Sequence, residues 1–357
     1  MAAAGAGSNQ YRTRGVPRKL RSAGAALLNQ AASSISQVPC SQVWGGDCQV
    51  PVGPPYWSHN QRHQLVHPAH PTMEMKLKAA EDAGTPPAVL SRLAQDLDSL
   101  VRVRTAENPT NPPESLGRLI GDPDWVVRQA VAVNQAVTPA MLGRLAQDER
   151  REVRQRVAED PRTTPELLGR LIGDPDWVVR QAVAANRAVT PAMLGRLAQD
   201  ERREVRQRVA ENPRTPPASL SLLADDQSNQ IRESVARNDA TSPTLLGILS
   251  RDRWPAVRQA VGTRRTSPPE VLAKLATDDH SDVRRTVARN PNTPPEILVQ
   301  LASDSNGSIR WDVAKNPNAP ARALEKLLQD DLLGLAETAA NNPGLPNSIR
   351  ALWQLAH

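Results

Sequence analysis

Residues 290–315 read NPNTPPEILVQLASDSNGSIRWDVAK, and the same pattern returns every 26 residues through most of the chain. The first position of the pattern is occupied in turn by Asp82, Asn108, Asn134, Asp160, Asn186, Asn212, Asn238, Arg264, Asn290 and Asn316. Ten repeats therefore fill residues 82–341, and we number them 1 to 10. A constant period of this length predicts a repeat protein in which each copy stacks on the next.

The first half of each repeat predicts a short helix. Residues 293–296 (Thr-Pro-Pro-Glu) and 267–270 (Ser-Pro-Pro-Glu) place a hydroxyl where an N-cap is expected, proline in the first turn and glutamate three residues after the hydroxyl. Two leucines three residues apart, such as Leu116 and Leu119, then share one side of the segment. The segment is short enough to be either an α-helix or a 3₁₀ helix.

The second half of each repeat predicts another short helix. Aliphatic residues four apart, such as Val127 and Val131, form its inward stripe, and the Asn-Pro pair of the next repeat ends it. Four inward aliphatic side chains cannot offset the entropy of ordering 26 residues, so a repeat is not stable by itself. The sequence therefore predicts an all-α solenoid without β-sheet, in which neighbouring repeats share their Leu and Val faces.

The flanks of the array differ from it. Residues 1–75 are rich in Ala, Ser, Gly and Gln and then in Pro and His, which predicts a disordered N-terminal extension before a repeat domain at 76–341. Residues 1–36 also have the composition of an organellar transit peptide, whereas Met73 or Met75 is an alternative start of translation. Residues 342–357 resemble half of an eleventh repeat and are expected to act as a C-terminal cap.

Charge and cysteine content narrow the possible functions. The chain carries 44 basic and 38 acidic residues, a net charge of +6, of which residues 1–75 contribute +4. The array is thus nearly neutral, which makes nucleic-acid binding an unlikely role. No apolar run approaches the roughly 18 to 20 residues that cross a bilayer, so we expect a soluble protein with no membrane partner. With only Cys40 and Cys48 present, a reducing compartment, the cytoplasm, is the expected location.

The pattern at residues 290–304 and 308–314 resembles the leucine-rich repeat variant family, and the resemblance extends over residues 82–341. It implies a right-handed superhelix of alternating α and 3₁₀ helices, and the Asp and Val-Arg positions are also similar to HEAT-type repeats. Some family members carry an N-terminal domain in which four cysteines hold a 4Fe-4S cluster. This chain departs from that pattern, because it has only Cys40 and Cys48. We therefore expect no cofactor, and an iron–sulfur or metal-linked accessory role is the alternative function.

An arginine follows the inward valine or isoleucine in nine of the ten repeats, and Ala336 takes its place in the tenth. These arginines are Arg102, Arg128, Arg154, Arg180, Arg206, Arg232, Arg258, Arg284 and Arg310. An aspartate recurs with the same period, from Asp96 to Asp330. Recurrent opposite charges are usually paired, so we expect a structural ladder in which each Arg binds an Asp of its own or the adjacent repeat. A basic stripe that binds a ligand is the alternative.

Two residues before the inward valine, Trp125, Arg151, Trp177 and Arg203 alternate along repeats 2 to 5. If this position faces solvent, it forms a column in which cation–π stacking is possible, made of residue types that are common in interface hot spots. The alternative is that both tryptophans only cover gaps between repeats. Their recurrence would then reflect duplication, since residues 108–159 and 160–211 are identical at 45 of 52 positions.

The motifs that signal catalysis or metal binding are missing from the repeats. There is no His-Glu-x-x-His motif and no phosphate-binding glycine loop. His59, His63, His67 and His70 lie near Cys40 and Cys48, but nearby prolines make a helix there improbable and the spacing is not that of a zinc site. The sequence thus indicates a non-enzymatic scaffold that binds a protein partner through one face of the solenoid, with Trp125, Arg151, Trp177 and Arg203 as the candidate contact residues.

Overall fold

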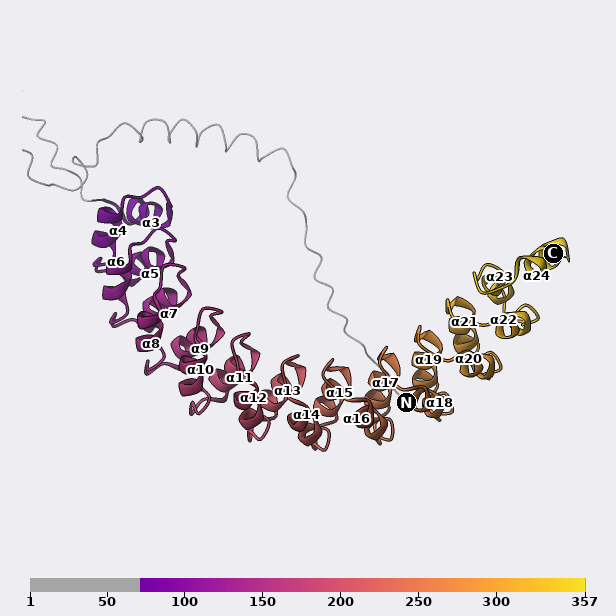
Figure 1. Cartoon of the computed structure of the whole chain (residues 1–357). Coiled ribbons are helices and arrows are strands. Elements are labelled where there is room, and N and C mark those ends of the chain that lie inside the picture. Colours follow the sequence, from indigo (N-terminus) through magenta and orange to yellow (C-terminus); the bar gives the residue numbers. More distant parts are fainter. Residues whose placement is uncertain (1–70, 357) are drawn as a thin grey trace, which may run out of the picture. The chain divides into compact units, whose positions relative to one another are not determined.

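The computed structural model describes residues 71–356, and every regular element in this range is an α-helix (Figure 1). Helix α3 (Met73–Glu81) precedes the repeats and begins inside the segment predicted to be disordered. The rest of that segment, residues 1–70, lies outside the described residues. The compact unit that contains all ten repeats begins at Ala79. None of the helices between residues 71 and 356 has both the length and the apolar character needed to cross a bilayer.

Each repeat contains two helices. The first helices are α4 (Pro87–Leu93), α6 (Pro113–Leu119), α8 (Pro139–Leu145), α10 (Pro165–Leu171), α12 (Pro191–Leu197), α14 (Pro217–Leu223), α16 (Pro243–Leu249), α18 (Pro269–Leu275), α20 (Pro295–Leu301) and α22 (Ala321–Leu327). The second helices are α5 (Ser99–Glu107), α7 (Trp125–Val133), α9 (Arg151–Glu159), α11 (Trp177–Ala185), α13 (Arg203–Glu211), α15 (Asn229–Arg237), α17 (Pro255–Thr263), α19 (Ser281–Arg289), α21 (Gly307–Lys315) and α23 (Leu335–Ala340), and α24 (Asn347–Ala356) follows.

The first helices are α-helical, which settles the choice that their length leaves open. In α6, the backbone N–H of Leu116 donates to the carbonyl of Pro112, four residues earlier, at 3.1 Å. A three-residue spacing appears at both ends of the helix, as in the bonds from the N–H of Ser115 to the carbonyl of Pro112 and from the N–H of Gly121 to the carbonyl of Arg118. The 3₁₀ geometry is therefore confined to the first and last turns of the helix.

Every first helix begins at the sixth position of its repeat, and the fifth position is its N-cap. Where a single proline is present, the hydroxyl takes the fifth position and caps the helix: Thr138 Oγ1 accepts the N–H of Met141 at 3.3 Å. The prediction that Thr293 and Ser267 are N-caps is wrong. With two prolines the hydroxyl lies at the fourth position, so Pro294 and Pro268 occupy the N-cap. The Thr293 hydroxyl instead donates to the carbonyl of Val287, at 2.6 Å.

The second helices begin and end at defined polar residues. In α7, the side chain of Asp124 accepts the N–H of Val126 at 2.9 Å and so caps the helix. The helix ends at Val133, and the backbone of its C-cap residue, Asn134, is extended. The inward stripes are buried as the sequence predicts: Leu116 and Leu119 are 0% and 2% exposed, and Val127 is 0% exposed.

The repeats stack in register. Figure 1 shows the second helices next to one another along one side of the stack and the first helices along the other. We call these two sides the second-helix face and the first-helix face. Between them lies a continuous core of Leu, Val, Ile and Ala side chains from neighbouring repeats. This arrangement makes each repeat depend on the next for the burial of its apolar side chains.

Asparagine occupies the first position of seven of the ten repeats and fastens the turn to earlier repeats. The Asn186 side-chain amide donates to the carbonyl of Asp160, at the start of the preceding repeat, and to that of Ala158, at the end of the repeat before it, at 2.9 and 2.7 Å. Repeat 4 begins with Asp160, which has no such donor. There, Arg162 Nη2 reaches the carbonyl of Asn134 at 2.9 Å and also binds the Asp160 carboxylate at 2.6 Å. The arginine thus replaces a hydrogen bond that the aspartate cannot make.

Candidate interaction surfaces

The recurrent arginines of the second helices are joined to the recurrent aspartates. The guanidinium of Arg128 donates to both carboxylate oxygens of Asp148 in the next repeat, from Nε at 2.6 Å and from Nη2 at 2.9 Å. Its Nη1 donates to the backbone carbonyl of Asp122, in its own repeat, at 2.7 Å. One guanidinium therefore binds the loops of two neighbouring repeats.

The same geometry recurs along the array. The pairs are Arg102–Asp122, Arg128–Asp148, Arg154–Asp174, Arg180–Asp200, Arg206–Asp226, Arg232–Asp252, Arg258–Asp278, Arg284–Asp304 and Arg310–Asp330, with shortest distances of 2.5–2.7 Å. We call this series the arginine ladder. It ends at Ala336, and the residue 20 positions later, where an aspartate would be needed, is Ala356. Guanidinium groups held in this way are not free to bind a ligand.

The ladder also determines the ionisation of its members. Burial raises the pKa of Asp148, but the hydrogen bonds from Arg128 and from the backbone N–H of Arg150 outweigh burial, so the pKa lies below its ordinary value. The hydrogen bond with Asp148 in turn raises the pKa of Arg128. Both groups therefore stay charged at neutral pH, and each link of the ladder is an ion pair.

Trp125, Arg151, Trp177 and Arg203 are each the first residue of a second helix, in four consecutive repeats. Trp125 and Trp177 are half-buried and pack against the core, whereas Arg151 and Arg203 are exposed. Arg151 Nη1 binds Asp176, the residue that caps the helix of Trp177, at 3.1 Å. We call these four residues the Trp–Arg column.

The cation–π contact at the column comes from outside it. The guanidinium of Arg150 lies over the ring of Trp125, 5.1 Å from its centroid. Arg151 is drawn instead to carboxylates, since its Nε also approaches Glu152 at 3.2 Å. Arg203 makes only the equivalent contact with Glu204 and keeps 66% of its side chain exposed. The arginines of the column are thus positioned by acidic neighbours and not by the tryptophans.

Exposed aliphatic side chains lie on the second helices of repeats 1 and 2. Leu100 in α5 is 44% exposed, and Val126 and Val133 in α7 are 37% and 51% exposed. Val178, the equivalent of Val126 in α11, is half-buried. Repeats 3 and 5 carry Glu152 and Glu204 at this position. The second-helix face therefore alternates between apolar and charged repeats.

The first-helix face carries arginines that sequence reasoning missed. Arg118, Arg144, Arg170 and Arg196 occupy the sixth position of four consecutive first helices, and all four are exposed. The signal is present in the sequence, because the letters LGRL recur at 116–119, 142–145, 168–171 and 194–197. The two leucines of this motif are the inward pair, so the arginine between them is easily overlooked.

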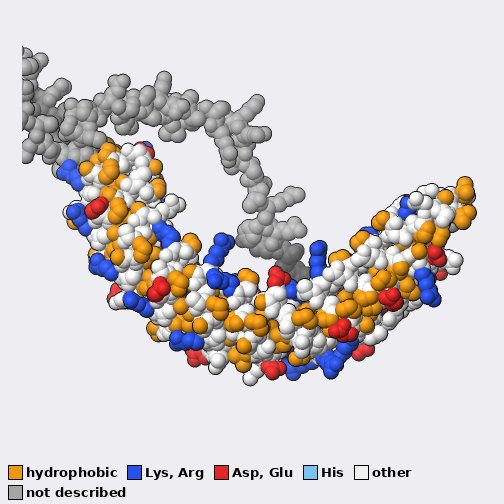
Figure 2. Space-filling view, in the orientation of Figure 1, with side chains coloured by type: hydrophobic (Ala, Val, Ile, Leu, Met, Phe, Trp, Pro, Cys, Tyr) orange, Lys and Arg blue, Asp and Glu red, His pale blue; other side chains and the backbone are white. Residues whose placement is uncertain are grey.

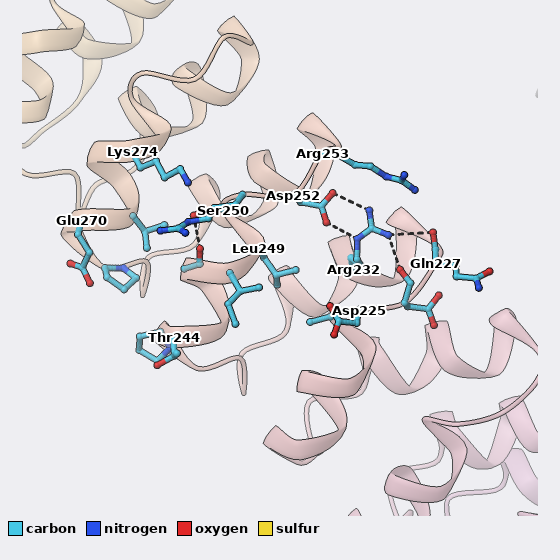
Figure 3. Close-up of a pocket in the computed structure, with 18 residues that line it drawn as sticks. Asp225, Gln227, Arg232, Thr244, Leu249, Ser250, Asp252, Arg253, Glu270 and Lys274 are labelled. Atoms are coloured by element: carbon cyan, nitrogen blue, oxygen red, sulfur yellow. Dashed lines mark hydrogen bonds and ion pairs between the residues drawn. The ribbon is translucent and has the colours of Figure 1, made fainter.

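A hollow of about 1090 Å³ opens on the first-helix face of repeats 6 to 8 (Figure 3). Gly247, Ile248, Arg251, Arg253 and Lys274 contribute to its lining, and the Arg232–Asp252 pair forms one wall. Partial burial and the nearby Arg251 lower the pKa of Lys274. Asp225 and Glu270 also line the hollow, so acidic and basic side chains are mixed in it. The hollow is lined by no His or Cys side chain.

Cys40, Cys48 and the histidines from 59 to 70 lie outside the described residues. Within residues 71–356, no three His, Cys, Asp or Glu side chains are grouped so that they could hold a metal ion.

Comparison with known proteins connects the chain to one repeat family. The family model described as leucine rich repeat variant matches residues 282–306, from the second helix of repeat 8 to the first helix of repeat 9. A solved structure described as a leucine-rich repeat variant with a novel repetitive structural motif is 32% identical. The alignment covers 57% of this chain and 80% of that one, with a TM-score of 0.48.

Two further solved structures are more distant. An engineered protein is 16% identical over 80% of this chain and 95% of its own, with a TM-score of 0.35. A designed armadillo repeat protein is also 16% identical, over 71% of this chain and 96% of its own, with a TM-score of 0.17. No curated protein matches the chain.

Proposed function

We propose that this chain, which belongs to the leucine-rich repeat variant family, is a non-enzymatic scaffold that binds a protein partner on the second-helix face of repeats 2 to 5. The observation that carries the proposal is the Trp–Arg column with Val126 and Val133 beside it, where large apolar and guanidinium groups are presented together. Such combinations are typical of the centres of protein interfaces.

The distribution of polar groups supports a binding role over a catalytic one. The arginine ladder uses nine arginines and nine aspartates to join repeats. The charged groups of the second-helix face are mostly paired with each other, as in Arg156–Glu159 and Arg208–Glu211. A partner would therefore meet a wide, mixed surface instead of a closed pocket. We place the protein in the cytoplasm, because it has only two cysteines and neither lies in the repeats.

The test changes the surface without disturbing the fold. Val126→Glu with Val178→Glu gives repeats 2 and 4 the residue that repeats 3 and 5 already carry, so the variant should fold. The wild-type and variant chains are used to capture partners from native lysate, with cross-linking and mass spectrometry. We expect the most abundant specific partner to be lost or to fall about tenfold, since two carboxylates would be buried in an apolar interface.

A matched control is Ser221→Glu with Ala273→Glu on the first-helix face, which adds the same charge at exposed positions. Equal recovery of every partner by the wild type and by the Val126→Glu, Val178→Glu variant would rule out this surface. Loss of the same partner in both variants would show a general effect of charge and would also count against the proposal.

A further inference from the structure

Six consecutive repeats present an exposed row on the first-helix face that changes from basic to apolar. The row consists of the sixth residue of each first helix, namely Arg118, Arg144, Arg170, Arg196, Leu222 and Ile248. We call it the first-helix row. Figure 2 shows Lys and Arg side chains at regular intervals along this edge of the first repeats, and the residues of the row recur with the 26-residue period. The row lies on the first helices, whereas the Trp–Arg column begins the second helices.

The four arginines of the row differ from those of the ladder. All four are exposed, and none of their side chains forms a hydrogen bond or ion pair with another described residue. The same helices hold only two acidic residues, Glu114 and Glu166, so these four helices carry a net charge of +2. Glu166 is engaged at the start of its own helix, where its backbone N–H and the hydroxyl of Thr164 lower its pKa. The guanidinium groups therefore remain available to an external anion.

The surface beside these arginines is most open at Arg144. Each arginine is preceded by a glycine, at positions 117, 143, 169 and 195. A Cβ placed on Gly143 would have no heavy atom within 4 Å, whereas a Cβ on Gly117 or Gly169 would lie 3.5 or 3.3 Å from the methyl carbon of Met141 or Met193. Gly143, Thr164 and Arg170 help to line a cleft of about 160 Å³. A chain that follows the row can therefore approach the backbone most closely at Gly143.

The apolar end of the row adjoins the large hollow. Leu222 and Ile248 are 49% and 57% exposed, and Ile248 lines the hollow together with Arg251 and Lys274 (Figure 3). Aliphatic side chains that are exposed in adjacent repeats form an apolar surface that a partner can cover. The row thus offers four cations and then two apolar contacts, in a fixed order.

We propose that the first-helix row docks an extended acidic polypeptide segment of a partner protein, with carboxylates on the four arginines and aliphatic side chains on Leu222 and Ile248. Helices of neighbouring repeats pack about 8–10 Å apart, and an extended chain in the polyproline II conformation rises about 3.1 Å per residue with three residues per turn. Every third residue of the segment therefore meets the next arginine. A guanidinium group binds a carboxylate in bidentate fashion, through two parallel N–H···O hydrogen bonds, which favours this pairing. The surface is separate from the one assigned under the proposed function.

The row fits a peptide better than a nucleic acid. Helices α6, α8, α10 and α12 contain no aromatic residue on which a base could stack. Glu114 and Glu166 would repel a backbone that carries a charge at every nucleotide, whereas a peptide can place an uncharged residue there. Leu222 and Ile248 have no role in binding phosphates, but they match the aliphatic side chains that a peptide can supply.

The experiment measures binding by fluorescence anisotropy with the full chain. The probe is a fluorescein-labelled peptide with glutamate at four successive third positions, leucine at the next two and serine elsewhere, together with the same peptide in reversed order. Arg144→Gln with Arg170→Gln should weaken binding of the preferred peptide about tenfold or more, because two carboxylates of the peptide lose their guanidinium partners. Leu222→Ser with Ile248→Ser should weaken it about fivefold. Added salt should weaken binding to the wild type.

The matched control is Arg156→Gln with Arg208→Gln, which removes the same charge from the second-helix face, where these side chains are 45% and 46% exposed. Binding kept by this control and lost by the row variant supports the proposal. It is overturned if the wild type binds neither peptide, if a peptide with glutamine in place of glutamate binds equally well, if both variants lose binding equally, or if a single-stranded oligonucleotide of the same charge binds more tightly. Circular dichroism melting confirms that each variant is folded. The test leaves the Trp–Arg column unchanged, so its failure says nothing about the proposed function.

Discussion

Arg128 joins three segments of the chain with one planar group. Its guanidinium bridges the Asp148 carboxylate of the next repeat and the carbonyls of Asp122 and Pro123 in its own loop. The side chain is almost fully buried, and the hydrogen bonds replace the water that burial removes. Lysine carries the same charge but has a single nitrogen and no fork, so it cannot bind all three groups with this geometry.

Arg180→Lys, near the middle of the ladder, should therefore lower the stability of the array. Arg180 donates to both oxygens of Asp200 and to the carbonyl of Asp174, and lysine would leave at least one of these acceptors unpaired. We expect a loss of about 1–2 kcal/mol in the free energy of unfolding, measured by urea denaturation. The control is Arg203→Lys, at a site where 66% of the side chain is exposed, which should change stability little. An equal effect of both substitutions would contradict the role given to the ladder.

At the turn that begins repeat 4, Arg162 compensates for the aspartate that stands in place of asparagine. Most repeats begin with an asparagine whose amide donates to two carbonyls, one at the start of the preceding repeat and one at the end of the repeat before that. In repeat 4 the aspartate at this position would be buried without a partner, but Arg162 neutralises it and makes one of the missing hydrogen bonds. The two residues at 160 and 162 act as one unit, so their substitutions should not have additive effects.

A double-mutant cycle tests this coupling. Arg162→Ala alone should destabilise the array by about 1–2 kcal/mol, because it leaves the Asp160 carboxylate buried and unpaired. In the background of Asp160→Asn, the new amide can donate to the preceding repeat, and Arg162→Ala should then have an effect of less than about 0.5 kcal/mol. Thermal unfolding followed by circular dichroism gives both values. Equal losses in the two backgrounds would show that the residues are independent.

Across the whole array, stability is a sum of similar links between neighbours. Six ladder carboxylates, at Asp148, Asp200, Asp252, Asp278, Asp304 and Asp330, have pKa values below the ordinary one. In Asp330 the hydrogen bond from Arg310 is the main cause, whereas in the other five the partners outweigh a raising effect of burial. Their contributions add because each carboxylate belongs to a different interface.

The array should therefore unfold at acid pH. A carboxylate with a lowered folded-state pKa stabilises the fold fully above its unfolded value of about 3.9, and the contribution is lost as pH falls through the folded value. We expect the urea midpoint to be nearly constant from about pH 7 to 5 and to fall steeply below about pH 4. Asp200→Asn should lower the midpoint at pH 7 and reduce the slope below pH 4. A midpoint that stays constant down to about pH 3 would be incompatible with this account.

The sequence predicts the stacked helices because the same pattern occurs ten times, and agreement among copies removes the ambiguity of each one. The sequence does not show whether a ladder arginine binds the aspartate of its own repeat or that of the adjacent repeat, because the aspartates of all repeats recur with the same period. The structure shows that Arg128 uses the side chain of Asp148 and the backbone of Asp122. The Thr293 cap is misplaced for a local reason, since the first of two prolines occupies the N-cap position and the hydroxyl lies one residue before it. Arg118 is visible in the sequence, but only its exposure distinguishes it from a ladder arginine.

The last rung of the ladder has a consequence for assembly. A stack in which each unit grips the next by an identical head-to-tail contact has no inherent length, and such contacts lead to filaments when they continue from one molecule to another. Here Arg310 is the final donor, and Ala336 offers no guanidinium with which to hold a further unit. The distal end is occupied instead by α24, which Arg350 fastens through the carbonyls of Ala340 and Asn342. The methyl side chain of Ala336 thus leaves the arginine ladder without a donor for a further unit.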